Sequence, residues 1–133
     1  MVIGHWEMRI VSEKSLGNLL VYQSALNLSD MAWQIYTPLS KELKFGMGGQ
    51  FIRAVDSIGA NIAEGYGRFH FRDKIKFYYN ARGSLWEAKH WLLLLHKRGF
   101  VNKENFELFL SRINLAGKQL NGFIASTGVP NDQ

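Results

Sequence analysis

The stretch that decides the fold is FRDKIKFYYNARGSLWEAKHWLLLLHKR, residues 71–98. Apolar side chains recur along it at alternating steps of three and four, which is the spacing of one side of an α-helix. This seam consists of Tyr78, Ala81, Leu85, Ala88, Leu92 and Leu95. Gly99 followed by Phe100 is typical of a C-terminal cap with its apolar contact. The spacing therefore predicts one long helix over residues 71–98.

Three further segments carry the same helical period, and no segment shows a convincing period of two. They cover residues 19–36, 40–65 and 102–128. Their apolar stripes are Val21, Ala25, Leu28, Ala32 and Ile35; Phe45, Ile52, Val55, Gly59 and Ile62; and Phe106, Phe109, Ile113, Ala116, Leu120 and Phe123. Pro38 ends the first helix, Ser40 and Asn102 are suitable N-caps for the others, and Gly65 and Gly67 stop the second.

Because the connections are short, consecutive helices are expected to be antiparallel neighbours. The sequence therefore predicts an all-α protein, an antiparallel up-down-up-down four-helix bundle over residues 16–127, with an N-terminal extension at 1–15 and a C-terminal tail at 128–133. A length of 133 residues allows one domain, and a hydrophobic share of 47% with a charged share of 20% excludes intrinsic disorder.

Several classes of function have no support in the composition. The absence of cysteine excludes disulfides, thiolate metal sites and cysteine nucleophiles. The longest aliphatic run, residues 92–95, is too short to cross a bilayer, and no signal-peptide pattern is found. His90 and His96 lie about 120° apart on a helix and cannot share a metal. We therefore expect a cytoplasmic protein with no membrane contact, no metal, no cofactor and no enzymatic activity.

The net charge of +5 is concentrated in the middle of the chain. Residues 41–98 contain eleven basic and five acidic side chains, hence +6, whereas residues 1–40 carry −1 and residues 99–133 are neutral. Four of the basic side chains surround the corner between the second and third helices: Arg53, Arg68, Arg72 and Lys76. With Phe69, Phe71 and Tyr79 interleaved, these side chains suit single-stranded or irregular nucleic acid. The alternative is a solvated surface that serves solubility.

A polar string, Ser57, Asn61 and Glu64, lies beside the apolar stripe of the second helix. Polar groups near a core cost about 1–3 kcal/mol each unless they are hydrogen-bonded. We expect them to form a clasp that bonds backbone groups at the Gly65–Gly67 corner and at the start of the third helix; the alternative is a ligand site.

The third helix has more apolar surface than a monomer needs. A second stripe, about a third of a turn from the seam, consists of Tyr79, Arg82, Trp86, His90, Leu93 and Lys97. Because large exposed aromatic patches are uncommon on soluble monomers, the stripe predicts a homo-oligomer. The expected interface residues are Tyr79, Trp86, His90 and Leu93.

The segment RAVDSIGANIAEGYGR, residues 53–68, carries a specific pattern, together with Lys44-Phe45-Gly46 before it and Ala81-Arg82-Gly83-Ser84-Leu85 after it. It resembles the 23S rRNA intervening-sequence proteins, a family of four-helix bundles related to the accessory variability determinants of diversity-generating retroelements. The resemblance implies a ring, typically a homopentamer, and the retroelement relatives bind nucleic acid through a basic surface and partner a reverse transcriptase.

By this likeness, Arg53, Arg68 and Arg82 occupy positions that are usually basic or polar in the family. The signature turn is filled by Ser57, Asn61, Glu64, Gly65 and Gly67. Gly48-Gly49 replaces a common Thr-Ser pair and Ile52 replaces an arginine, which thins the basic surface of the second helix.

Two hypotheses from different classes follow. The first is a non-enzymatic, oligomeric bundle, a pentamer by the resemblance, that binds RNA or DNA through its basic surface as an accessory to a reverse transcriptase or an rRNA-associated element. The second is a protein–protein scaffold in which the exposed stripe serves self-assembly alone.

Overall fold

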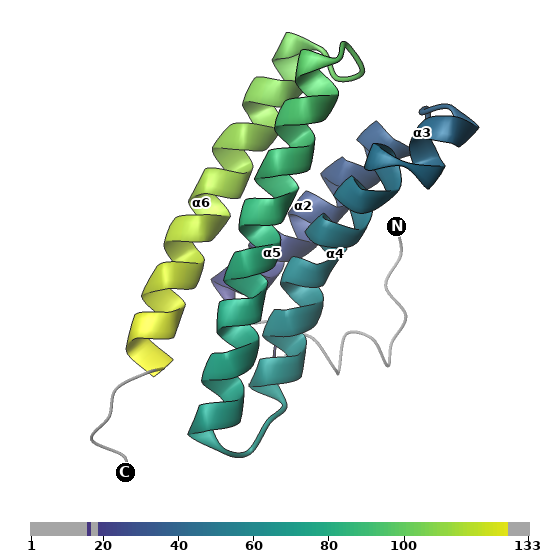
Figure 1. Cartoon of the computed structure of the whole chain (residues 1–133). Helices are drawn as coiled ribbons and strands as arrows, with labels where there is room; N and C mark the ends of the chain where they lie inside the picture. Colours follow the sequence, from purple (N-terminus) through teal and green to yellow (C-terminus); the bar gives the residue numbers. More distant parts are fainter. Residues whose placement is uncertain (1–15, 17–18, 128–133) are drawn as a thin grey trace, which may run out of the picture.

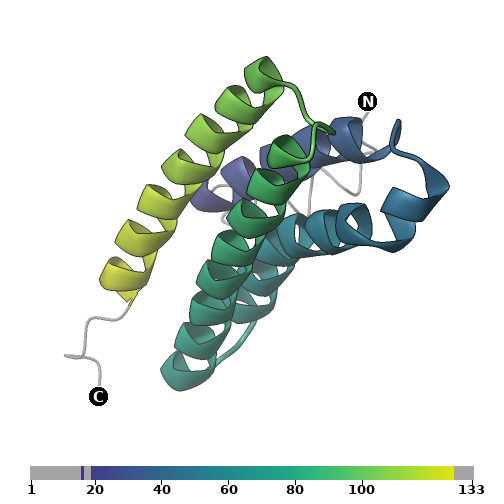
Figure 2. The same ribbon diagram turned by 45° about the horizontal axis from the view of Figure 1, so that its top comes forward.

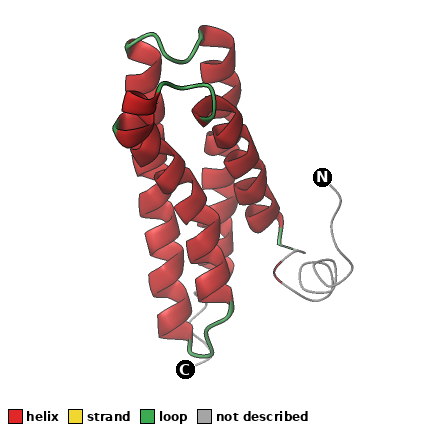
Figure 3. Ribbon diagram, turned by 90° about the vertical axis from the view of Figure 1, so that its right-hand side faces the viewer, coloured by secondary structure: helices red, strands yellow, loops and turns green. Residues whose placement is uncertain are grey.

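The computed structural model describes residue 16 and residues 19–127, and within them it contains helices and short loops (Figures 1 and 3). The helices are α2 (Leu20–Tyr36), α3 (Lys41–Phe45), α4 (Met47–Tyr66), α5 (Phe71–Lys97) and α6 (Lys103–Thr127). The predicted extension at 1–15 and tail at 128–133 lie outside the described residues. Within the described part of the chain, no helix is both long enough and apolar enough to cross a membrane.

The four long helices pack around one core in the cyclic order α2, α4, α5, α6. Consecutive long helices run in opposite directions, and α2 begins beside α6 and crosses behind α5 and α4 in the view of Figure 1 (also Figure 2). The predicted antiparallel four-helix bundle is therefore confirmed.

The seam of α5 faces the core as its period predicts. All six seam residues are 3% exposed or less, and the described chain buries no polar or charged side chain. The rings of Phe51 and Phe109 link α4 to α6 with centroids 5.4 Å apart, and Tyr78 meets Phe123 at 4.7 Å. Because burial of each large apolar side chain stabilises by roughly 1.5–3 kcal/mol, this seam is the main stabilising contribution of α5.

The predicted second helix is wrong in one respect, because it is two helices. The backbone breaks at Gly46, with φ −100° and ψ −123°, and Phe45 is 80% exposed instead of lying in the core stripe. A Cβ on Gly48 would lie 2.7 Å from the Leu43 carbonyl oxygen, so this close approach of α3 to α4 requires a glycine. Because the apolar period continues through Gly46, the sequence pattern does not reveal the break between the two helices.

The hydrogen bonds at three helix ends confirm the predicted caps. Ser40 accepts a hydrogen bond from the Leu43 amide at 3.2 Å, and Asn102 accepts one from the Asn105 amide at 2.8 Å. Gly99 adopts φ +85°, and the Phe100 amide donates to the Leu95 carbonyl at 2.8 Å. This is the Schellman arrangement, which satisfies the last carbonyls of α5.

Candidate nucleic-acid interface

Close packing fixes the corner between α4 and α5. A Cβ on Gly65 would lie 2.6 Å from Cε1 of Tyr78, so only glycine allows this approach. The Lys74 ammonium donates to the Tyr66 carbonyl at 2.9 Å and lies 5.5 Å from the centre of its ring. Burial raises the pKa of Tyr78 from its ordinary value of 10.0 to about 12, with a smaller contribution from the neighbouring Tyr66 phenol.

The polar string does not form the expected clasp. The Asn61 amide donates to the Ser57 carbonyl at 2.8 Å, within its own helix. Glu64, whose side chain is 51% exposed, pairs with Arg68 at 2.7 Å. Each of these two side chains bonds to a residue four positions away, so neither bond joins α4 to α5. The bond between α5 and the end of α4 is made by Lys74, which sequence analysis did not identify.

The five basic candidates fall into three places. Arg68 is paired with Glu64 and its guanidinium lies 4.7 Å from the centre of the Phe77 ring, so part of its charge is already neutralised. Arg72 and Lys76 are exposed on α5 close to the corner. Arg53 lies on the exposed side of α4, about 20 Å along the helix from its end at the corner. Arg82 lies further along α5 and donates to Asn121 of α6 at 3.2 Å.

The outward side of α5, opposite the seam, gathers cations. At about 100° per residue, an arc of about 140° contains the five basic side chains Arg72, Lys76, Arg82, Lys89 and Lys97. The two carboxylates of the helix, Asp73 and Glu87, fall outside this arc, and Glu87 accepts a bond from the Trp91 indole at 3.2 Å. We call this arc the outward face of α5.

The predicted interface residues lie on the same face and are open to solvent in the single chain. Tyr79, Trp86 and Leu93, which follow one another at intervals of seven residues, are 48%, 62% and 46% exposed. Arg82 lies over the Tyr79 ring at 4.8 Å. His90, the fourth member, is exposed and meets Trp91 edge to face at 4.8 Å. The structure therefore brings the expected interface and three of the five basic candidates onto one helix.

A cleft of about 380 Å³ opens beside this face, between α5 and α6. We call it the basic cleft; its lining residues are Arg82, Leu85, Trp86 and Lys89 from α5, and Ile113, Asn114, Gly117, Lys118 and Asn121 from α6. None of these is a carboxylate. Sequence analysis did not single out Lys89 or Lys118, although spacings of three and four place each on the same side of its helix as the other polar lining residues.

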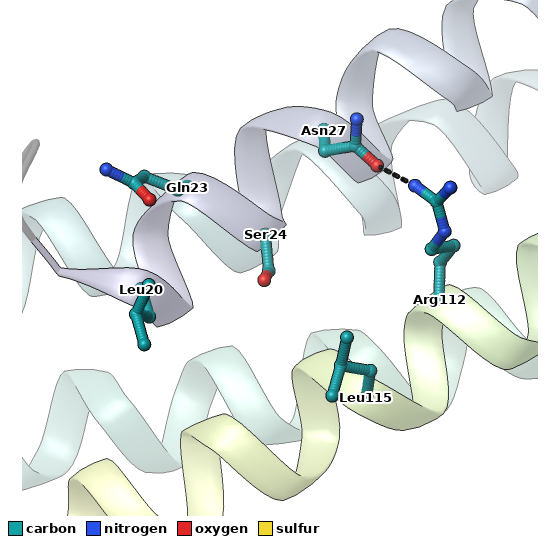
Figure 4. Close-up of a pocket in the computed structure, with 6 residues that line it drawn as sticks. All are labelled: Leu20, Gln23, Ser24, Asn27, Arg112 and Leu115. Carbon is teal, nitrogen blue, oxygen red and sulfur yellow. Dashed lines mark hydrogen bonds between the residues drawn. The ribbon is translucent and has the colours of Figure 1, made fainter.

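A second pocket, of about 270 Å³, lies between α2 and α6 and has a different character (Figure 4). Its one cation is Arg112, which donates to Asn27 at 3.0 Å. The Ser24 hydroxyl donates to Gln119 across the same pair of helices. Leu20 and Leu115 supply apolar walls and are 68% and 50% exposed. This pocket offers an anion far less positive charge than the basic cleft does.

No group of three or more histidine or carboxylate side chains in residues 16 and 19–127 could hold a metal ion.

The comparisons agree with the family suggested by the signature turn. The sequence model of the 23S rRNA-intervening sequence proteins matches residues 17–122. A solved structure from Bacteroides thetaiotaomicron VPI-5482, a protein of unknown function from the S23 ribosomal protein family, is 28% identical to this chain. It superposes with a TM-score of 0.75 and covers 80% of this chain and 96% of its own. No curated protein matches. The chain belongs to the 23S rRNA-intervening sequence protein family.

Proposed function

We propose that this chain is a non-enzymatic, self-associating bundle of the cytoplasm that binds nucleic acid through the outward face of α5. The observation that carries the proposal is the charge of that face, which has five cations and no carboxylate within about 140° of arc. The homopentameric state and the partnership with a reverse transcriptase, both implied by the family resemblance, belong to the same proposal. In this proposal the Tyr79 and Trp86 rings contact the nucleic acid, so of the expected interface residues His90 and Leu93 serve self-association.

Single-stranded or irregular nucleic acid fits this face better than a regular duplex. Guanidinium groups bind phosphates through paired hydrogen bonds, and exposed rings stack on unpaired bases. Trp86 and Tyr79 present such rings among the cations. A regular duplex has no unpaired base to stack on them.

The test is binding of a labelled single-stranded RNA across a salt titration. We expect the double variant Arg72→Glu with Lys76→Glu to bind about tenfold more weakly or worse, and to lower the salt slope by about 0.7 for each phosphate contact removed. Arg68 is left unchanged because its ion pair with Glu64 already offsets part of its charge.

The matched control reverses two lysines on α3, Lys41→Glu and Lys44→Glu, which alters the net charge equally on another part of the molecule. It should retain affinity close to that of the unaltered chain. Equal losses in both double variants would show that net charge alone attracts the RNA, and would contradict a defined interface.

The second candidate function is a scaffold that uses the outward face only for self-association. The half-exposed stripe of Tyr79, Trp86 and Leu93 favours it. Leu93→Glu should then give monomers in light scattering, whereas Leu26→Glu on α2, at a closely matched exposure of 45% against 46%, should leave the mass unchanged. Absence of RNA binding at physiological salt, combined with this loss of mass, would favour the scaffold over the nucleic-acid proposal.

A further inference from the structure

We infer that the basic cleft between α5 and α6 holds one nucleotide unit of a single-stranded nucleic acid, with its base against Trp86 and its phosphate among Arg82, Lys89 and Lys118. This inference rests on the proposed nucleic-acid binding and gives it a site. The sequence analysis placed the basic side chains around the α4–α5 corner, whereas this inference centres the binding on a cleft that two helices build.

The shape of the cleft suits a ligand of this size. A volume of about 380 Å³ lies within the range of small-ligand sites, which is roughly 300–1,000 Å³. Gly117 contributes no side chain, so α6 does not fill the space in front of Leu85. Leu85 and Ile113 are buried and provide an apolar floor. A flat base can therefore enter without displacing a side chain from the core.

The positive charge of the cleft favours an anionic ligand. Three cations from two helices line it, and the described chain has its single ion pair elsewhere, between Arg68 and Glu64. Like charges held close together repel one another, and a bound anion removes that repulsion. The Asn121 side chain holds the Arg82 guanidinium through its bond of 3.2 Å. A phosphate with this positioned guanidinium beside it can form paired, charge-assisted hydrogen bonds.

The remaining lining groups distinguish a nucleotide from a simple inorganic anion. The Trp86 indole is 62% exposed and already has the Lys89 ammonium 4.3 Å from its centre, so cation and ring form one surface. Asn114 adds an amide that can both donate to and accept from a base edge. The Trp86 ring can stack on a base, the Asn114 amide can bond to the edge of that base, and the cations can bind its phosphate. Such a base must be unpaired, which restricts the ligand to single strands.

The first experiment measures the affinity of a labelled RNA of about 12 nucleotides, within the usual site size of single-strand binders. Lys118→Glu should weaken binding about tenfold, whereas Lys103→Glu, about 22 Å away along the same helix, should change it less than about threefold. Asn114→Asp inserts a carboxylate without changing volume and should also weaken binding. Asn105→Asp, on the α2 side of α6, is its matched control.

The second experiment follows the Trp86 indole N–H signal by nuclear magnetic resonance, assigned through Trp86→Phe. Addition of the RNA should shift this signal in the unaltered chain, and Lys118→Glu should need about tenfold more RNA for the same shift. Adenosine monophosphate that binds as tightly as the RNA would overturn the assignment to a strand, in favour of free nucleotides.

Failure of this inference can be distinguished from failure of the proposed function. If the unaltered chain binds no RNA, the proposed function itself fails. If it binds, and Arg72→Glu with Lys76→Glu weakens binding while Lys118→Glu matches Lys103→Glu, the cleft is refuted and the proposed function stands. A change of oligomeric mass in Lys118→Glu without a change in affinity would assign the cleft to a second copy of the chain, and would also overturn the inference. Because Lys118 is exposed, the variant is expected to fold, which circular dichroism checks.

Discussion

On α5, the side that faces the core and the side that faces away differ in exposure, charge and partners. The seam from Tyr78 to Leu95 is almost fully buried and carries no charge. The outward face carries five cations, none of them in the single ion pair of the described chain, and three large apolar side chains at 46–62% exposure. Folding accounts for the seam completely and for the outward face hardly at all. In the proposed function, fold and binding are therefore encoded on separate sides of one helix.

The largest expected effect comes from two adjacent leucines that fall on opposite sides. Leu92 is fully buried, so Leu92→Ala should cost about 2–5 kcal/mol of unfolding free energy through lost burial and the remaining cavity. Leu93 is 46% exposed, and Leu93→Ala should cost less than about 1 kcal/mol. Urea unfolding of the two variants measures both values. Similar losses would mean that the outward face is as necessary to the fold as the seam.

Two adjacent tyrosines sharpen the comparison through pH. The pKa of Tyr78 is about 12 in the folded chain against 10.0 normally, so above pH 10 the unfolded chain loses this proton first. Stability from this group is complete below pH 10 and declines as the pH rises to 12, by roughly 2–3 kcal/mol in total. Tyr78→Phe should remove this part of the decline. Tyr79→Phe, which removes the adjacent exposed hydroxyl on the outward face, is the matched control for loss of a hydroxyl. An alkaline decline that Tyr78→Phe leaves unchanged would contradict the burial of Tyr78.

The smallest effects concern glycines on the two sides. Gly65→Ala brings a methyl group against the Tyr78 ring and should cost about 1–3 kcal/mol. Gly83 lies on the exposed part of α5 with no atom within 4 Å of its would-be Cβ, so Gly83→Ala should stabilise by about 0.5–1 kcal/mol. In thermal unfolding, Gly65→Ala should lower the melting temperature and Gly83→Ala should raise it. A loss in Gly83→Ala would indicate that something packs closely against the outward face.

The sequence predicts the seam and the caps well because both follow from local chemistry. All six α5 seam residues are buried, and Ser40, Asn102 and Gly99 end helices as expected. The break at Gly46 was not predictable from period, because it depends on how closely α3 approaches α4.

The candidate site was less predictable, since neighbours in sequence separate along a helix by about 1.5 Å per residue. Arg53 and Arg82 lie away from the corner for this reason. Conversely, the basic cleft depends on Lys118, which is 36 positions after Arg82 yet lines the same space. Only the packing of α6 beside α5 brings them together.

The bonds that join α2 to α6 have a consequence for how the bundle keeps its alignment. Apolar contacts are not directional, so they discriminate between alignments of α2 and α6 less sharply than hydrogen bonds do. A slip of one turn, about 5.4 Å, would break both the Ser24–Gln119 and the Asn27–Arg112 bonds. These two hydrogen-bonded pairs therefore favour one register of α2 against α6. They contribute little to stability, but both are formed only in the observed alignment.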